Sequence, residues 1–262
     1  MMQKDKKLIK PGYNEGIAVT KGFVVNYEIS QKASDNSDFI KVVEGVLENT
    51  KIVPGVIHAD GAYGNEENMS YLEEKEIGNY LKYGTYRCEK SRKWHQGKVR
   101  KEDFLYEQEY DRYRCVNGKY LYFEEENERV LGSGYKKTVR TYKALEQDCS
   151  GCVFKEACTK GKSRGIEISE KYERLKDRAR SNLDSEKGQE LRHRRGYEVE
   201  TVFGDKKENN FRRRFYLRGK AKVLIECGIY YTAHNLRKLY WIILKMMMEG
   251  IRGYQMTIEY MG

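Results

Sequence analysis

Asp60 ends a short apolar run and begins a glycine-containing turn, in the stretch VIHADGAYGNEEN at residues 56–68. The run from Val56 to Ala59 has the length and composition of a buried strand. A carboxylate at the carboxyl end of a strand is well placed for catalysis, because ligands of open α/β sheets collect at that edge. The alternative is an ordinary turn aspartate, since aspartate favours turns through hydrogen bonds to its own backbone.

A second acidic residue, Glu200, lies in the strongly basic stretch RRGYEVETVFGDKKENNFRRRFYLRGKAK at residues 194–222. In a helix, Glu200, Phe203, Gly204 and Lys207 would share one face, and the small Gly204 would let a ligand or another backbone come close. A carboxylate among cations suits a metal ion held at a phosphodiester. The alternative is an ordinary solvated, charged helix. The flanking cations are Arg195, Arg212, Arg213, Arg214 and Arg218.

Three of the six cysteines are closely spaced in CSGCVFKEAC at residues 149–158. Cys149 and Cys152 form a C-x2-C pair, which is a natural knuckle for tetrahedral Zn²⁺, and Cys158 follows it. Cys115 would supply the fourth thiolate of a closed structural site, with Cys88 as a rival for that position. Free thiols are the alternative, because the sequence has no second C-x2-C pair to complete the usual zinc pattern.

The spacing of apolar residues predicts the elements that would position the two acids. Residues 16–30 contain two apolar runs with a two-residue break, which predicts a tight β-hairpin. Residues 35–48 have helical spacing, and a helix with Asn65 as its N-cap should run to about residue 76. A short strand is expected near residues 79–83. This β-β-α-β-α-β order predicts an α/β fold with a mixed sheet flanked by helices.

The character of the sequence changes at about residue 84. Residues 84–164 are crowded with Tyr, Arg, Lys and Cys and contain no long apolar period. We interpret residues 84–189 as a Cys-rich insertion subdomain with a candidate zinc site, which interrupts a core formed by residues 1–83 and 190–262.

Residues 219–249 form a strong helical pattern, within which Cys227 is expected to be a buried structural thiol. The longest apolar run, residues 239–248, is interrupted by Lys245 and is well short of the ~20 residues that a membrane span needs. No N-terminal stretch has the pattern of a signal peptide. The sequence therefore predicts a cytoplasmic protein without a membrane partner.

The composition indicates a polyanionic partner. The 262 residues carry a formal net charge of +10, with 39% hydrophobic and 34% charged residues. Clustered Lys and Arg gain affinity for phosphates by releasing counterions, so nucleic acid is the leading candidate. A general lysine-rich bias of the source proteome is the alternative.

The two acidic motifs together resemble the DDE transposases of bacterial insertion sequences, and PGYN upstream and AHNLRKL downstream extend the resemblance over nearly the whole chain. In that family the second acid ends a strand in an Asp-x-x-Tyr context, which Asp60 and Tyr63 match. The last acid is a Glu followed seven residues later by a Lys, which Glu200 and Lys207 match. An Arg shortly before the Glu corresponds most nearly to Arg195.

The resemblance implies a ribonuclease H-like catalytic core and a DNA partner, the transposon ends. Three carboxylates would hold two divalent ions, Mg²⁺ or Mn²⁺, for in-line attack on a phosphodiester by water or a 3′-hydroxyl. Asp60 would bridge the ions, Glu200 would hold one of them, and Lys207 would contact DNA. The complete protein is expected to be a homodimer, and similar cysteines recur in the insertion of one branch of the family.

Two departures from the family pattern concern the first catalytic acid. In the family this acid lies upstream of the Tyr-Asn motif, on an opening strand with an Asp-Gly-Thr-like context, but only twelve residues precede Tyr13 here and none matches. Gly16 also stands where the family tends to have Gln. We therefore expect an N-terminally truncated transposase with an incomplete acidic triad, inactive alone. The alternative function is a basic, zinc-stabilised protein that binds DNA without cutting it.

Overall fold

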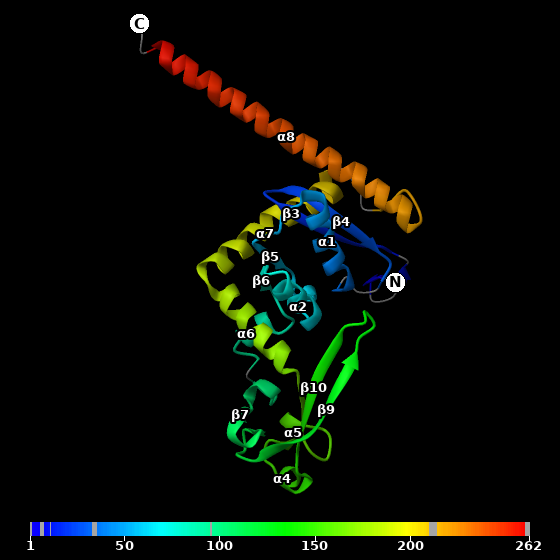
Figure 1. Ribbon diagram of the computed structural model, residues 1–262, viewed down its shortest axis with the longest axis vertical. Coiled ribbons are helices and arrows are strands. Elements are labelled where there is room, and N and C mark those ends of the chain that lie inside the picture. The colour runs from blue at the N-terminus through cyan, green and yellow to red at the C-terminus, as the bar shows by residue number, and fades with distance from the viewer. Residues whose placement is uncertain are drawn as a thin grey trace. The chain divides into compact units, whose positions relative to one another are not determined.

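The chain folds into two compact units, residues 1–55 with 186–262 and residues 56–185. The computed structural model describes the backbone of residues 2–5, 8–10, 12–32, 36–94, 96–209 and 214–259, and the side chains of 12–32, 36–94, 96–207 and 214–249. Figure 1 shows the elements of both units. The expected division after residues 83 and 189 does not coincide with these units and stays a prediction.

Among its described residues, the first unit contains two antiparallel strand pairs, three α-helices and a π-helix. The hairpin formed by residues 14–30 turns at Lys21 and Gly22, both of which have positive φ angles, of 50° and 77°. That conformation suits the two-residue connection predicted from the sequence. In chain order the elements are β1 (Met2–Asp5), β2 (Leu8–Lys10), β3 (Asn14–Thr20), β4 (Phe23–Ser30), α1 (Phe39–Thr50), α7 (Glu186–Gly204), a π-helix (Asp205–Asn209) and α8 (Lys220–Glu259).

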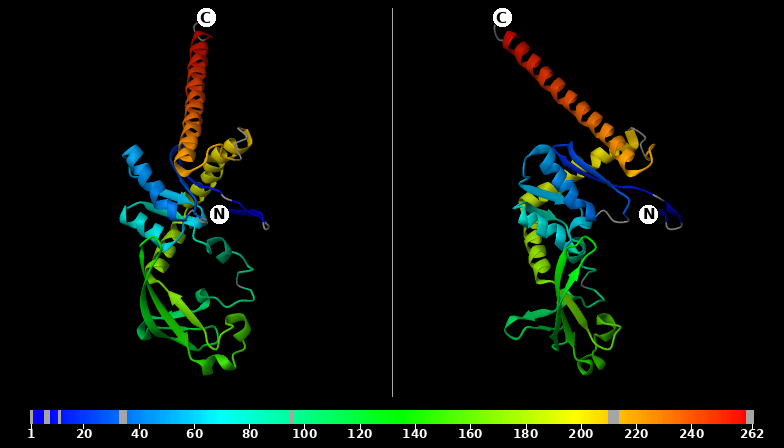
Figure 2. Two further views of the ribbon diagram at one scale, coloured as in Figure 1. Left: turned by 90° about the vertical axis from the view of Figure 1, so that its right-hand side faces the viewer. Right: turned by 45° about the vertical axis from the view of Figure 1, so that its right-hand side comes forward.

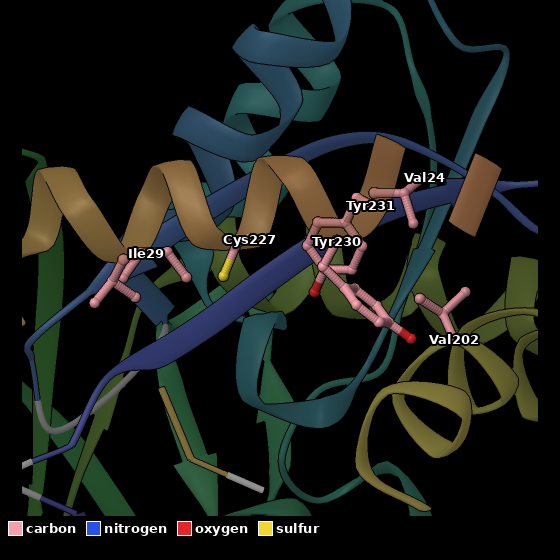
Figure 3. Packing of buried hydrophobic residues seen from close by; sticks show 7 residues of the cluster. Val24, Ile29, Val202, Cys227, Tyr230 and Tyr231 are labelled. Atoms are coloured by element: carbon pink, nitrogen blue, oxygen red, sulfur yellow. The ribbon is translucent and has the colours of Figure 1, made fainter. Parts of the chain in front are cut away.

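The core of this unit lies between the hairpin, α7 and the first part of α8. Val24 and Ile29 from β4 pack with Val202 from α7 and with Cys227 and Tyr231 from α8, as Figure 3 shows. Cys227 is only 1% exposed, so the prediction of a buried thiol is confirmed.

Two residues of the AHNLRKL motif tie α8 to the hairpin. The Asn235 side chain accepts a hydrogen bond from the backbone N–H of Val24 at 2.9 Å and donates to the carbonyl of the same residue at 2.8 Å. His234 Nε2 lies 3.1 Å from the carbonyl oxygen of Gly22. Asn235 thus satisfies both polar backbone groups of Val24, as a neighbouring strand would.

The second unit begins with the segment that carries Asp60. β5 (Val56–Ala59) pairs in parallel with β6 (Gly78–Leu81), and α2 (Glu66–Glu74) connects them. α6 (Glu170–Asp184) packs against α2 and β6, where the Arg174 guanidinium donates twice to the Glu73 carboxylate at 2.7 Å. The predicted strand–helix–strand order around Asp60 is confirmed.

The rest of the second unit contains a five-stranded antiparallel sheet, which is visibly curled in Figure 2. Its core consists of Phe104, Leu121, Tyr142, Ala144, Ile166 and Ile168. The strands are β7 (Leu105–Glu107), β8 (Arg112–Arg114), β9 (Tyr120–Val130), β10 (Lys136–Ala144) and β11 (Gly165–Ile168), and the short helices are α3 (Tyr86–Glu89), α4 (Glu146–Ser150) and α5 (Lys155–Cys158).

The fold is therefore α/β, as predicted. Among the described residues, the hairpin β3–β4 and the parallel pair β5–β6 are separate two-stranded sheets, so a single ribonuclease H-like mixed sheet stays a prediction. No helix within the described part of the chain is long and apolar enough to cross a membrane.

Candidate active site

Asp60 lies immediately after β5, at the carboxyl end of the strand. The residue is exposed and has an extended backbone, with φ −73° and ψ 166°, and its carbonyl accepts a hydrogen bond from the N–H of Tyr63 at 3.0 Å. This bond closes the 3-10 turn Gly61–Tyr63. The structure thus presents a carboxylate at the strand end where the sequence places it.

Gly64 fixes the turn after Asp60 against the end of β6. A Cβ atom on Gly64 would lie 2.0 Å from the carbonyl oxygen of Lys82, a distance at which backbone would have to move. The carbonyl of Gly64 also accepts a hydrogen bond from the Tyr172 hydroxyl at 2.7 Å. Only glycine allows this approach of two backbone segments.

The first turn of α2 holds the other side of the Asp60 turn. The Asn65 side chain accepts from the N–H of Asn68 at 2.9 Å, which confirms Asn65 as the N-cap. Glu66 is 5% exposed, accepts from the Tyr135 hydroxyl at 3.2 Å and lies 3.4 Å from Lys137 Nζ. Tyr135 belongs to the β9–β10 connection, so the five-stranded sheet braces the helix that follows Asp60.

Glu200 lies on α7 in the other unit, and its side chain is 64% exposed. The closest described cation is on Arg195, whose guanidinium lies 3.6 Å from the Glu200 carboxylate. A guanidinium at this distance partly offsets the carboxylate charge and can exchange that contact for a phosphate. Arg195 was assigned to this region from the sequence alone, and the structure brings the two together.

Lys207 lies beyond the end of α7, in the π-helix Asp205–Asn209. Its side chain is exposed, with Nζ 5.4 Å from the Phe203 ring centroid. The sequence predicted one continuous α-helical face through Glu200, Gly204 and Lys207. This is wrong in detail, because the α-helix ends at Gly204 and the wider π-turn changes the spacing. A Cβ atom on Gly204 would meet nothing within 4 Å, so the position is open to a ligand.

Asp205, the residue after α7, is buried and anchors the π-helix to α8. Its carboxylate accepts from the Tyr230 hydroxyl at 3.0 Å, pairs with Arg237 and lies 3.5 Å from Nδ1 of His234. Sequence reasoning did not assign Asp205 a role. The sequence did offer one signal for Asp205, which is its position between Gly204 and Lys207 of the motif that follows Glu200.

Lys206 is buried beside it, in a cage of aromatic rings. Nζ lies 4.9 Å from the Phe215 ring centroid and 5.3 Å from that of Tyr231, and it donates to the Glu15 carboxylate. Glu15 also accepts from the hydroxyl of Tyr231 at 2.6 Å and from the thiol of Cys227 at 3.1 Å. A buried lysine needs such partners because an unpaired charge in the interior is strongly unfavourable.

The environment of Glu15 shifts the titration of its neighbours. Burial first, and then the negative charge of Glu15, raise the pKa of Cys227 to about 12. The same two causes raise the pKa of Tyr231 far above its ordinary value. The Cys227 thiol and the Tyr231 hydroxyl therefore remain protonated at neutral pH. Both donate hydrogen bonds to the Glu15 carboxylate, which in turn pairs with Lys206.

The remaining predicted DNA contacts are partly outside the described residues. Arg214 is described and exposed, whereas Arg212 and Arg213 lie outside the described part of the chain. Within it, Arg195, Lys207 and Arg214 are the predicted phosphate-binding cations. Of these, Lys207 directly follows the two buried anchors Asp205 and Lys206.

The four cysteines predicted to bind zinc lie close together in the second unit. Cys115, Cys149 and Cys158 pack against the core of the five-stranded sheet. Burial raises the pKa of Cys158, Arg164 opposes that shift, and the thiols of Cys149, Cys115 and Cys152 add to it. All four are free thiols, and Cys88 is an exposed one on α3.

Metal binding has no direct support in the side-chain arrangement. Across the described ranges, no group of three or more His, Cys, Asp or Glu side chains is placed to hold a metal ion. This applies both to the expected zinc site and to the expected magnesium site. Asp60 and Glu200 belong to different units, so each is described by its own surroundings.

Comparison with known proteins identifies one family. Residues 114–240 match the model of a family described as a transposase DDE domain. The matched region includes Arg195, Glu200 and Lys207, together with the cysteines of the second unit from Cys115 to Cys158, and lies downstream of Asp60. No curated protein and no solved structure matches the chain.

Proposed function

We propose that this chain, whose residues 114–240 match the model of the transposase DDE domain family, acts on DNA at transposon ends by metal-dependent cleavage and strand transfer of phosphodiesters. The observation that carries the proposal is the family match over Glu200 and Lys207. Its support in the structure is that both side chains are exposed: Glu200 lies beside Arg195 on α7, and Lys207 lies in the π-helix that follows.

Transposases of this kind generally use a divalent metal such as Mg²⁺, and the chemistry of the two acids suits such an ion. Mg²⁺ prefers carboxylate oxygens and retains several waters, so exposed carboxylates such as Asp60 and Glu200 are suitable ligands. A bound ion would supply Lewis-acid activation of the phosphodiester and of the attacking hydroxyl. We assign Asp60 and Glu200 as its ligands within a ribonuclease H-like core.

The chain's own cations would bind and orient the DNA. Arg214 is exposed and Arg195 is partly buried, and the guanidinium group of an arginine suits phosphate oxygens through paired hydrogen bonds. Lys207 would contact a phosphate as a point charge from a backbone segment fixed by Asp205 and Lys206. Arg212 and Arg213 extend the same basic stretch in the sequence.

We further propose that the chain alone cuts DNA poorly. Asp60 and Glu200 are the two acids that match the family pattern, and two carboxylates offset little of the charge of two divalent ions. DNA binding through the cations does not depend on those ions and should persist. No observation supports the alternative of a DNA-binding protein unrelated to catalysis.

The experiment compares binding and cleavage in the same samples. The chain, Asp60→Asn and Glu200→Gln are incubated with labelled DNA that contains the ends of the element encoding the chain, with Mg²⁺ or Mn²⁺. We expect binding by all three proteins and at most slow nicking, absent from both variants. Rapid cleavage by the unaltered chain would show that another acid completes the site, and absence of DNA binding would overturn the proposed function.

The four clustered thiols remain the proposed zinc ligands. Mutual proximity of Cys115, Cys149, Cys152 and Cys158 supports this, but the thiols would have to draw together, since the described arrangement is not a metal-binding group. Protein purified without chelator should contain close to one zinc per chain, lost in Cys149→Ser and retained in Cys88→Ser. Protein without zinc would leave these residues as free thiols.

A further inference from the structure

Helix α8 exposes a continuous apolar seam along most of its described length. Its members recur at alternating steps of three and four residues, and each is between 45% and 66% exposed. Thr232, which is also exposed, occupies the one position of the series that is not apolar. The seam residues are Ile225, Ile229, Leu236, Leu239, Ile243 and Met246.

The seam is distinct from the face that α8 packs inside its own unit. Val223, Cys227, Tyr230 and Tyr231 point into the core, while the seam lies on other sides of the helix. The contacts of α8 with its unit extend to those of Arg237 with Asp205 and of Lys238 with Phe23, and Figures 1 and 2 show the later part of α8 extending away from the hairpin. Single exposed apolar side chains are normal on a protein surface, but six of them in one row form a contiguous apolar patch.

Between residues 225 and 246, the basic side chains of α8 lie off the seam. A shallow groove on a different face is lined by His234, Arg237, Lys238 and Lys245, together with Trp241 and Ile242. None of these residues is a seam position. A partner helix could therefore cover the seam without burying a lysine or an arginine, which would be unfavourable if left unpaired.

We propose that the seam is the dimer interface of this protein and that its partner is the same seam on a second copy of the chain. A 3-4 apolar repeat is the pattern by which two helices pack knobs into holes, and it is self-complementary because each copy presents the same row. From residue 225 to residue 246 the seam is ~32 Å long.

The area is sufficient for a stable contact. The six side chains expose on the order of 700 Å² per chain, so pairing would remove roughly 1,300 Å² in total, above the ~1,000 Å² expected of a specific interface. The proposal depends on α8 alone and holds whether or not the proposed function does.

Sedimentation equilibrium of the full chain, over concentrations from about one to one hundred micromolar, tests the proposal. We expect a mass approaching twice the 30.9 kDa of one chain. Ile243→Glu should shift the chain to monomer, with at least a hundredfold weaker association. Met248→Glu is the matched control, because Met248 is 50% exposed, close to the 48% of Ile243, but lies off the seam.

A variant that strengthens dimerisation is a useful second test, because misfolding cannot explain a gain of association. Thr232→Leu completes the apolar repeat and should tighten dimerisation about tenfold, since a leucine adds buried apolar area at the contact. Circular dichroism would show that each variant retains its helix content. A chain that stays monomeric at all concentrations, or a dimer indifferent to both Ile243→Glu and Thr232→Leu, would overturn the proposal.

Discussion

At the scale of single residues, two neighbouring lysines of the same motif have opposite environments. Lys206 is 5% exposed and paired with Glu15, whereas Lys207 is exposed. Sequence patterns do not distinguish them, because the difference arises from the π-helix that follows α7 and from rings contributed by α8. Burial makes Lys206 a structural anchor, whereas Lys207 is exposed to solvent, as its proposed DNA contact requires.

Replacing these two lysines should therefore have opposite effects. Lys206→Met leaves the Glu15 carboxylate buried without its cation and should lower the free energy of unfolding by about 3 kcal/mol. Lys207→Met should change stability by less than about 0.5 kcal/mol and weaken DNA binding instead. Urea denaturation and fluorescence anisotropy with a labelled duplex measure the two quantities. Equal loss of stability in both variants would contradict the assignment of Lys206 as the anchor.

The Cys227 thiol should be inert at mildly alkaline pH. Its pKa in the folded protein is raised to about 12, whereas the thiol in the unfolded chain has a pKa of ~8.5. The raised pKa contributes stability that is fully present below pH ~8.5 and is lost as the pH rises toward about 12. At pH 8.5, iodoacetamide should modify the exposed Cys88 within minutes and Cys227 only in denaturant, as mass spectrometry would show. Modification of both thiols at similar rates in the native protein would contradict this.

At the scale of elements, the segment around Asp60 was predictable and much of the second unit was not. β5, the Asn65 cap and α2 follow from strong local signals: a bounded apolar run, turn residues and an N-cap. In β9, by contrast, only Leu121 is buried, so the strand has no apolar alternation to detect. It is held to β10 by cross-strand pairs such as Arg140 with Glu126, at 3.3 Å, which only the register reveals.

The helical pattern of residues 219–249 illustrates a different limit. Periodicity predicted α8 correctly, but it did not show which apolar residues face the core. Val223 and Tyr231 are buried, whereas Leu236 and Ile243 are exposed on the same helix. Amphipathic spacing indicates that the apolar face of a helix is buried. It does not show whether the segment that packs on this face belongs to the same chain or to another one.

The turn between β5 and α2 should tolerate a methyl group at one glycine and not at the other. At Gly64 a Cβ atom would meet the Lys82 backbone at 2.0 Å, whereas at Gly61 it would meet nothing within 4 Å. Gly64→Ala should therefore lower the free energy of unfolding by about 3 kcal/mol or more, and Gly61→Ala by less than about 0.5 kcal/mol. Urea denaturation of both variants tests this, and a stable Gly64→Ala protein would show that β6 can move away.

At the scale of the whole molecule, the predicted site comprises parts from two units. The sequence predicted Asp60 at a strand end and Glu200 with Arg195 on a helix, and each local setting is confirmed. Their mutual distance could not be derived from local patterns, because it depends on how residues 56–185 meet the rest of the chain. The family match from residue 114 to residue 240 covers Glu200 together with the strands β9, β10 and β11.

The net charge of +10 predicts how DNA affinity should respond to salt. If the protein neutralises six or more phosphates, affinity should fall roughly a thousandfold between about 50 and 200 mM salt, because each contact releases condensed counterions. Removing one phosphate contact with Lys207→Ala should reduce the slope of log affinity against log salt by about one. The matched control is Lys41→Ala, which replaces an exposed lysine on α1 of the same unit.

Anisotropy titrations of a labelled duplex at four salt concentrations would give the slopes for the unaltered chain and for both variants. A slope unaffected by Lys207→Ala, or reduced equally by Lys41→Ala, would mean that the basic stretch after Glu200 is not where DNA binds.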